Sequence, residues 1–211
     1  MQVVDFMTVN PDLTYEKHLW HHYQYIAGLD EAGRGALAGP VAVGAVILPK
    51  SKTRLLRTLA GVRDSKQMTP LERDSLAPRI KAAALAWSIA FASADEIDSL
   101  GIVHATRLAA IRALQCLSIS PEYLLTDFRL ELPQLDISQT SLVKGDVRCL
   151  SIAAASVLAK TRRDSYMRQL DSEYPNYGLG EHKGYGTQAH RLAMKRWGYS
   201  SIHRKTFSFK S

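Results

Sequence analysis

The stretch that decides the fold is YIAGLDEAGRGALAGP, residues 25–40. It begins with an apolar run, residues 25–29, that is too short for a helix and therefore predicts a buried strand. The run stops at two adjacent carboxylates, Asp30 and Glu31, and a Gly-Arg-Gly triplet at residues 33–35 follows. Glycines at this place predict either a sharp turn or a close approach of the backbone to another molecule.

Two interpretations of the paired acids remain open from this stretch alone. Carboxylates at a strand end, beside backbone N–H groups and one guanidinium, suit a metal ion and a phosphate. The same residues also fit an ordinary surface turn in which Asp30 and Glu31 are solvated. The positions of other acids in the chain must therefore distinguish a metal or phosphate site from an ordinary turn.

Outward from this stretch, short apolar runs alternate with helical patterns, and no repeat or clear linker divides the chain. Residues 41–48 predict a strand that Pro49 ends, and we expect it to pair antiparallel with the first strand. Thr69 has the features of a helix N-cap, with Pro70 next and Glu72 three residues on. We expect further strands at 85–93 and 123–126, a brief apolar piece at 142–143 and a loop at 173–186. Helices are expected at 12–24, at 70–84, after a cap at Ser93 or Asp95, at 104–117, at 151–170, and at 188–197 after a cap at Thr187.

Composition limits the class of protein. A chain of 211 residues, 46% hydrophobic and 22% charged, is ordinary for one soluble domain with or without a small appendage. No apolar run reaches membrane-spanning length, and the first twenty residues lack the pattern of a secretory signal, so we expect a cytoplasmic protein. Cys116 and Cys149 are expected to be buried free thiols. The net charge of +7 is compatible with a polyanionic partner.

Two further acids share the strand-end context. Asp127 follows the run YLLT, and Asp146 follows SLVKG and precedes the longest predicted helix. Clustered carboxylates suit Mg²⁺ or Mn²⁺. Two such ions can stabilise both the attacking and the leaving oxygen when a phosphodiester is cleaved. Asp127 can instead begin a turn, and Asp146 can instead cap the helix. Asp164 lies inside that helix, where a surface ion pair with Arg168 is expected.

Five stretches, in this order, resemble the signatures of the ribonuclease HII family. The first is GLDEAGRG at residues 28–35 with the apolar run behind it. The others are RDSKQMT at 63–69, EIDSLGIVHAT at 96–106, KGDVRCLSIAAASVLAKTRRD at 144–164 and YPNYGLGEHKGYGT at 174–187. Together they cover most of the chain from residue 25 to residue 187.

The resemblance implies an α/β fold of the ribonuclease H type, with a mixed five-stranded sheet flanked by helices and a small C-terminal helical part. Residues 1–24 would form a leader and a short helix, and residues 25–172 the catalytic domain. Residues 173–211 would form a loop, a helix and a basic tail that pack on it.

The resemblance also implies an activity. It is the metal-dependent endonucleolytic hydrolysis of RNA in RNA–DNA hybrids, including single ribonucleotides in duplex DNA, leaving a 3′-hydroxyl and a 5′-phosphate. Such an enzyme would remove ribonucleotides from DNA, would use Mg²⁺ or Mn²⁺, and is expected to be a monomer away from membranes. The alternative is a non-catalytic hybrid-binding module of the same fold. The family's metal-binding catalytic acids match Asp30, Glu31, Asp127 and Asp146, and its junction-reading residues match Gly33, Arg34, Gly35 and Tyr185. We add Lys66 to the expected substrate-binding residues as a candidate phosphate contact.

The same match implies how a ribonucleotide would be recognised. A 2′-hydroxyl both donates and accepts hydrogen bonds, and the backbone of the triplet can reach it because glycines carry no side chain. Tyr185 would stack on the neighbouring deoxyribose; without the resemblance it is equally an ordinary loop aromatic. This chain has Phe128 where the family usually has glycine after the third acid. Lys66, Lys160, Arg163 and Lys183 are candidate phosphate contacts, and each is also compatible with a solvated surface charge.

Overall fold

A mixed five-stranded sheet forms the centre of the computed structural model, which describes residues 10–50, 54–127 and 130–208. The strand order is β3-β2-β1-β4-β5; β1 pairs antiparallel with β2 and β2 with β3, whereas β1–β4 and β4–β5 are parallel. The predicted fold class is therefore confirmed. The strands are β1 (Ile26–Ala32), β2 (Val41–Ile47), β3 (Ala86–Ala92), β4 (Tyr123–Asp127) and β5 (Ser138–Leu142).

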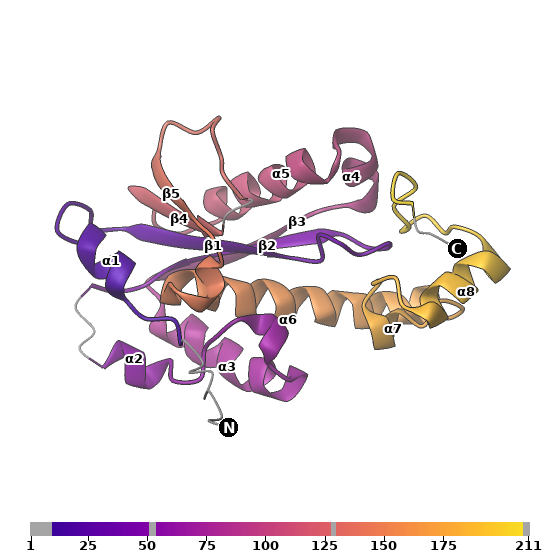
Figure 1. The fold of residues 1–211 in the computed structure, drawn as a ribbon, viewed down its shortest axis with the longest axis horizontal. Coiled ribbons are helices and arrows are strands. Elements are labelled where there is room, and N and C mark those ends of the chain that lie inside the picture. Colours follow the sequence, from indigo (N-terminus) through magenta and orange to yellow (C-terminus); the bar gives the residue numbers. More distant parts are fainter. Residues whose placement is uncertain (1–9, 51–53, 128–129, 209–211) are drawn as a thin grey trace, which may run out of the picture.

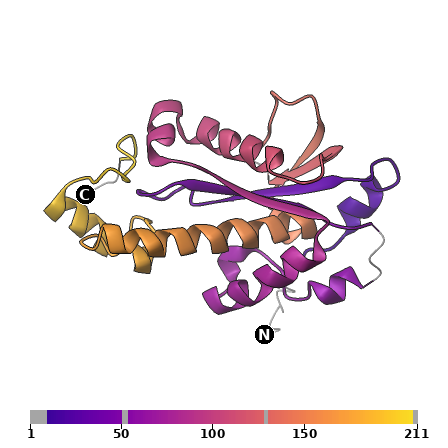
Figure 2. The same cartoon turned by 180° about the vertical axis from the view of Figure 1, so that it is seen from behind.

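Helices cover both faces of the sheet (Figures 1 and 2). On one face, α4 (Ala94–Leu100) and α5 (Ile102–Gln115) enclose one apolar cluster with the sheet. On the other face, α6 (Leu150–Glu173) and α3 (Pro70–Ala83) enclose a second cluster. The shorter helices are α1 (Thr14–Leu19), α2 (Leu55–Thr58), α7 (Leu179–His182) and α8 (Gln188–Trp197), with 3₁₀ turns η1 (Ser65–Gln67) and η2 (Gly145–Val147). No helix within the described ranges is long and apolar enough to cross a membrane.

Helix α6 lies very close to the sheet because the facing residues are small. An added Cβ at Gly28 of β1 would overlap the backbone of Ser151, and one at Gly44 of β2 would overlap the backbone of Ala155. A larger side chain at either glycine would push the helix away from the strands. This contact holds the two acids of β1 against the first turns of α6.

The capping residues that the sequence indicates are confirmed. Thr69 forms a capping box with Glu72 at the start of α3, which begins at Pro70 as predicted. Ser93, one of the two candidates, forms a second capping box at α4. The Thr187 side chain accepts a hydrogen bond from the backbone N–H of His190 in α8. Local sequence therefore determines where these helices begin.

Several expected boundaries are wrong, for physical reasons. β1 does not end before the acids but continues to Ala32, because its backbone pairs with β2 through that residue. β5 was not expected, since the edge strand SQTSL is largely polar and lacks an apolar signature. α1 covers six residues rather than thirteen, and α7 forms a single turn within the expected loop at 173–186. α2 lies in a stretch for which the sequence predicts no element. Cys149 is buried as expected, but Cys116 is exposed.

Candidate active site

The four candidate acids lie at the ends of neighbouring elements. Asp30 and Glu31 are in β1, Asp127 is the last residue of β4, and Asp146 is in η2. The last register pair of β1 and β4 lies one residue before Asp30 and Asp127, so these two acids follow it on adjacent parallel strands. The backbone N–H of Gly145 donates to Asp127 Oδ1 at 2.9 Å, which joins η2 to β4. The topology thus brings together acids from three distant parts of the chain.

Asp30 lies under α6 and is almost completely buried, at 2% exposure. It forms a side-chain hydrogen bond with Ser156, whose hydroxyl oxygen is 2.8 Å from that of Ser65 in η1. Burial, and next the charge of Glu31, raise the pKa of Asp30 well above its usual range, and Asp127 acts in the same direction. Without a compensating cation, Asp30 is therefore costly to ionise.

Glu31 points away from Asp30, because successive residues of a strand face opposite sides of the sheet. Its Oε1 is 3.6 Å from a guanidinium nitrogen of Arg34. Burial raises its pKa; the Arg34 charge opposes this effect, and the charge of Asp127 adds to it. The two acids of β1 therefore belong to one charge cluster but approach it from two sides.

Lys66 supplies positive charge beside the acids. Its Nζ is 3.6 Å from Asp146 Oδ2, while most of its side chain is exposed. Burial alone would lower the pKa of Lys66, but the carboxylates of Asp30, Asp146, Asp64 and Glu31 together raise it above its usual value. Burial, and next the charge of Asp64, raise the pKa of Asp146. The Lys66 ammonium thus stays charged and faces the carboxylates.

The acids have the donor chemistry that a divalent cation needs. Asp30 Oδ2 and Glu31 Oε2 are buried and have no hydrogen-bond partner among the described residues. Buried carboxylate oxygens normally have partners, and such oxygens are the ligands that Mg²⁺ and Mn²⁺ prefer. Within the described ranges, no three acidic, histidine or cysteine side chains already converge on one point. Asp30 and Glu31 face opposite sides of the strand, and their unpartnered oxygens fit a metal.

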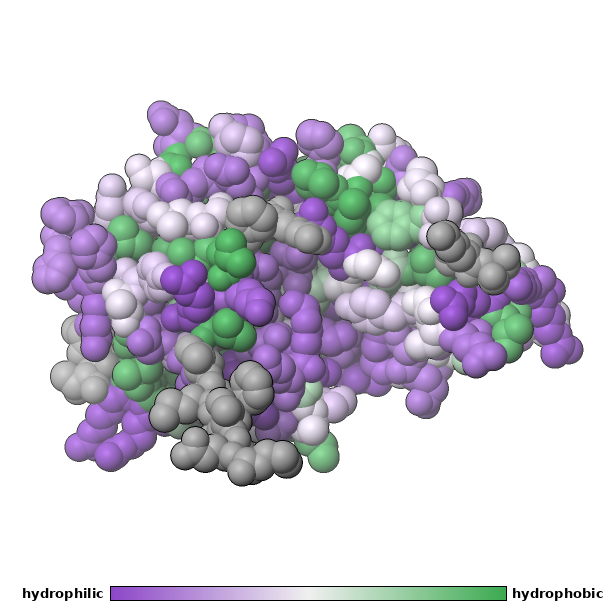
Figure 3. Space-filling model, in the orientation of Figure 1, coloured by the Kyte–Doolittle hydropathy of each residue, from purple (hydrophilic) through white to green (hydrophobic). Residues whose placement is uncertain are grey.

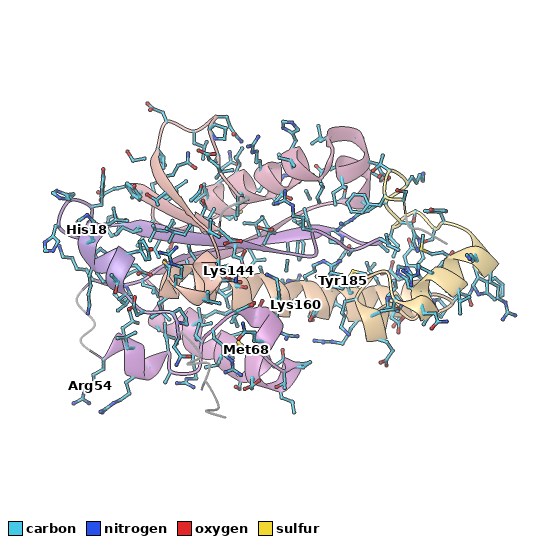
Figure 4. All side chains as sticks on the ribbon, viewed as in Figure 1. His18, Arg54, Met68, Lys144, Lys160 and Tyr185 are labelled. Atoms are coloured by element: carbon cyan, nitrogen blue, oxygen red, sulfur yellow. The ribbon has the colours of Figure 1, made fainter. Side chains whose placement is uncertain are left out.

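A pocket of about 590 Å³ opens beside Glu31, and all five predicted substrate-binding residues line it. Its lining includes the Gly-Arg-Gly triplet, Lys66, Lys160 and Tyr185. Lys160 on α6 and Tyr185, on the loop after α7, lie next to each other in Figure 4, with Lys160 Nζ 5.1 Å from the ring centre. The surface over α6 and α7 is mostly hydrophilic (Figure 3). Phe128, the departure after the third acid, lies outside the described residues.

Two expectations for α6 are wrong. Arg163 cannot contact phosphate, because its side chain is completely buried and donates to backbone carbonyls. Asp164 does not form a surface pair with Arg168; it is 4% exposed, and its carboxylate lies 2.9 Å from Arg73 and 2.8 Å from Lys160. A charged stretch of helix predicts a solvated face, but this part of α6 lies inside the protein.

Sequence reasoning missed three polar residues of the site. Asp64 and Ser65 stand beside Lys66 in the RDSKQMT stretch, which drew attention to the lysine alone. Ser156 ends the small-residue run SIAAAS, where a hydroxyl on a helix face packed against a strand was the available signal. Its contact with Asp30 depends on the close approach of α6 to β1, which sequence patterns do not show.

Known proteins similar to this chain share both its sequence and its fold. A family model described as Ribonuclease HII matches residues 27–210. A ribonuclease HII of Desulfitobacterium hafniense (strain DSM 10664 / DCB-2) is 45% identical over 208 residues, covering 98% of this chain and 78% of the relative. One from Dehalococcoides mccartyi is 46% identical over 200 residues, covering 94% and 93%. The crystal structure of ribonuclease H2 from Pyrococcus horikoshii OT3 aligns with a TM-score of 0.72 at 25% identity, covering 87% of this chain and 93% of that one.

Proposed function

This chain belongs to the ribonuclease HII family, a family of ribonuclease H-type nucleases, and from that premise we propose the substrate and the reaction. The proposed substrate is the RNA strand of an RNA–DNA hybrid, including a single ribonucleotide within duplex DNA. The proposed products carry a 3′-hydroxyl and a 5′-phosphate, and the proposed role is removal of ribonucleotides from DNA. The observation that carries the proposal is the pair of unpartnered buried oxygens on Asp30 and Glu31, of which Glu31 lines the pocket.

Asp30, Glu31, Asp127 and Asp146 are the residues that would hold Mg²⁺ or Mn²⁺. Bound ions of this kind stabilise negative charge on the attacking and leaving oxygens of a phosphodiester. Within the chain, the Ser156 hydroxyl contacts the carboxylate of Asp30 and is itself held by the hydroxyl of Ser65. Lys66 supplies a fixed positive charge that attracts the phosphate backbone to these acids.

Recognition of the ribonucleotide is proposed to lie in the triplet and Tyr185. Gly35 lines the pocket, and an added Cβ there would have no other atom within 4 Å. Its φ is not in the left-handed region, so the fold itself does not require glycine at this position. The missing side chain instead leaves room for a sugar to approach the backbone. Gly33 differs, because its φ is +86° and a Cβ would overlap Arg163.

Gly35→Ala is expected to leave stability nearly unchanged and to reduce cleavage. The new methyl group would enter the pocket, and a displacement of the substrate by about 1 Å can cost up to about a hundredfold in rate. We expect kcat/KM on a duplex with one ribonucleotide to fall ten- to a hundredfold, at an unchanged melting temperature. Gly33→Ala is the contrasting variant, because it should lower the melting temperature. A wild-type kcat/KM for Gly35→Ala would show that substrate does not approach this backbone.

The test of the proposed function uses duplex DNA that carries one ribonucleotide. We expect cleavage next to the ribonucleotide with Mg²⁺ or Mn²⁺, none with chelator, and none of an all-DNA duplex. Mass spectrometry of the fragments should show a 3′-hydroxyl and a 5′-phosphate. Uncut substrate with both metals would contradict the proposal, and tight binding in that case would identify the hybrid-binding module instead. Equal cutting of all-DNA duplex would indicate a different metal-dependent nuclease.

A further inference from the structure

Two arginines in the protein interior are held by backbone carbonyls. Arg163 and Arg204 are both 0% exposed and are the two largest of the fully buried side chains. Buried charges are usually paired with an opposite charge. In the described part of the chain neither guanidinium takes part in an ion pair. Their donors are instead satisfied by backbone carbonyls, which indicates that these side chains hold backbone segments together.

Arg204 binds the loop that follows β1. Its Nη2 donates to the carbonyl of Gly33 at 2.7 Å, and its Nη1 donates to that of Arg34 at 2.8 Å. Its Nε donates to the carbonyl of Gly39 at 3.0 Å. One side chain near the C-terminus therefore holds both ends of a loop that lies far away in sequence. A planar guanidinium can satisfy three carbonyls at once, whereas a lysine ammonium cannot match this geometry.

Arg163 joins the same loop to the segment that carries Tyr185. Its Nε donates to the carbonyl of Pro40 at 2.8 Å, and its Nη2 donates to that of Ala38 at 3.2 Å. Its Nη1 donates to the carbonyl of Lys183 at 2.9 Å, two residues before Tyr185. The guanidinium carbon is 5.4 Å from the Tyr185 ring centre. The two buried arginines thus connect the triplet, Tyr185 and the C-terminal segment.

The direction of these carbonyls determines where the next N–H groups point. The described chain contains no cis peptide bond, and in a trans peptide the C=O and N–H groups point in opposite directions. Because the carbonyl of Gly33 points to Arg204, the N–H of Arg34 points away from it. Because the carbonyl of Arg34 points to Arg204, the N–H of Gly35 also points away. Arg34 and Gly35 line the pocket, so two consecutive backbone donors are directed to that side.

We propose that Arg204 is a positioning residue for recognition of the ribose: it turns the N–H groups of Arg34 and Gly35 toward the pocket and fixes them relative to Tyr185. This inference rests on the proposed function, since it assigns these donors to the 2′-hydroxyl. Loss of the three hydrogen bonds from Arg204 would let the peptide groups that carry these two N–H groups rotate. The pocket would then still attract the phosphate backbone through its lysines but would no longer distinguish ribose from deoxyribose.

Arg204→Lys tests this assignment because it keeps the positive charge and removes the planar guanidinium that donates to three carbonyls. Affinity is measured in chelator, without cleavage, for a duplex with one ribonucleotide and for the same all-DNA duplex. We expect affinity for all-DNA duplex within about twofold of wild type, and a preference for the ribonucleotide duplex that falls tenfold or more. Arg196→Lys, an exposed change on α8, is the matched control and should keep the preference. Equal loss of both affinities, or an unchanged preference, would overturn the proposal.

A second measurement on the wild-type chain covers the case in which Arg204→Lys does not fold. We expect the amide NMR signals of Arg34 and Gly35 to shift with the ribonucleotide duplex and to shift clearly less with the all-DNA duplex. Identical shifts with both duplexes would overturn the proposal. If the wild-type chain neither prefers nor cleaves the ribonucleotide duplex, the proposed function itself has failed. If it does both while Arg204→Lys keeps the preference, only the role of Arg204 has failed.

Discussion

Asp30→Asn is expected to lower cleavage of a single-ribonucleotide duplex roughly a thousandfold while making the metal-free protein more resistant to heat. The loss follows because a bound metal contributes several kcal/mol to stabilising the transition state, and each 1.36 kcal/mol is a tenfold change in rate. The gain follows because the Asp30 carboxylate is buried beside Glu31 and Asp127, with one oxygen unpartnered. An amide has nearly the same shape and carries no charge.

The pH dependence of stability should show the same effect. Burial and the charge of Glu31 raise the pKa of Asp30 in the folded state, so this state holds its proton more tightly than the unfolded chain. Between the unfolded value, about 3.9, and the raised folded value, stability contributed by Asp30 is lost as pH rises. In chelator, the wild-type melting temperature should therefore fall over this window, and that of Asp30→Asn should fall less.

Thermal melts in chelator and single-turnover cleavage with Mg²⁺ measure both effects in one set of variants. Asp74→Asn removes an exposed acid on α3 and serves as the control, with wild-type cleavage expected. Added Mg²⁺ should raise the melting temperature of wild type more than that of Asp30→Asn, because the variant has lost a ligand. Cleavage within tenfold of wild type would remove Asp30 from the catalytic set.

Asp164→Asn is expected to reduce the free energy of unfolding by about 3–5 kcal/mol, the usual cost of breaking a buried ion pair. Asp164 and Arg73 are buried and 2.9 Å apart, so the change leaves the guanidinium charge without its carboxylate. Domains of this kind are stable by only about 5–15 kcal/mol, so the loss is a large fraction. Arg73 also donates to the carbonyls of Ser65 and Met68, which flank Lys66. Cleavage should therefore fall as well.

Chemical denaturation of Asp164→Asn measures this loss, and a double variant separates charge from packing. Arg73→Met with Asp164→Leu removes both charges and should recover much of the stability, because apolar pairs often replace buried ion pairs without cost. The double variant should not recover full cleavage, because η1 would lack the hydrogen bonds that Arg73 donates to the carbonyls of Ser65 and Met68. A loss below about 1 kcal/mol in Asp164→Asn would mean that the pair behaves like an exposed one.

The local features of this fold follow from the sequence. The apolar runs of β1 and β2, the capping residues of α3, α4 and α8, and the four candidate acids are recognised without coordinates. Each depends on residues within a few positions of one another, where backbone geometry and short-range hydrogen bonds decide the structure. The resemblance to ribonuclease HII implies the mixed five-stranded sheet, and the structure supplies the strand order, which periodicity does not contain.

The tertiary structure decided which charges are exposed and what they contact. Asp164 pairs with Arg73, 91 positions away, and Arg204 holds the carbonyl of Gly33, 171 positions away. A lone sequence pattern treats Arg163, Asp164 and Arg204 as solvated, because charged residues usually are. Asp164 is buried where α6 meets Arg73 of α3, whereas the two arginines are buried where α6 and the C-terminal segment meet the loop after β1. The sequence by itself thus determined the candidate acids and the strands that carry them. Long-range packing determined the surroundings that raise the pKa of Asp30, and it placed the triplet beside Tyr185.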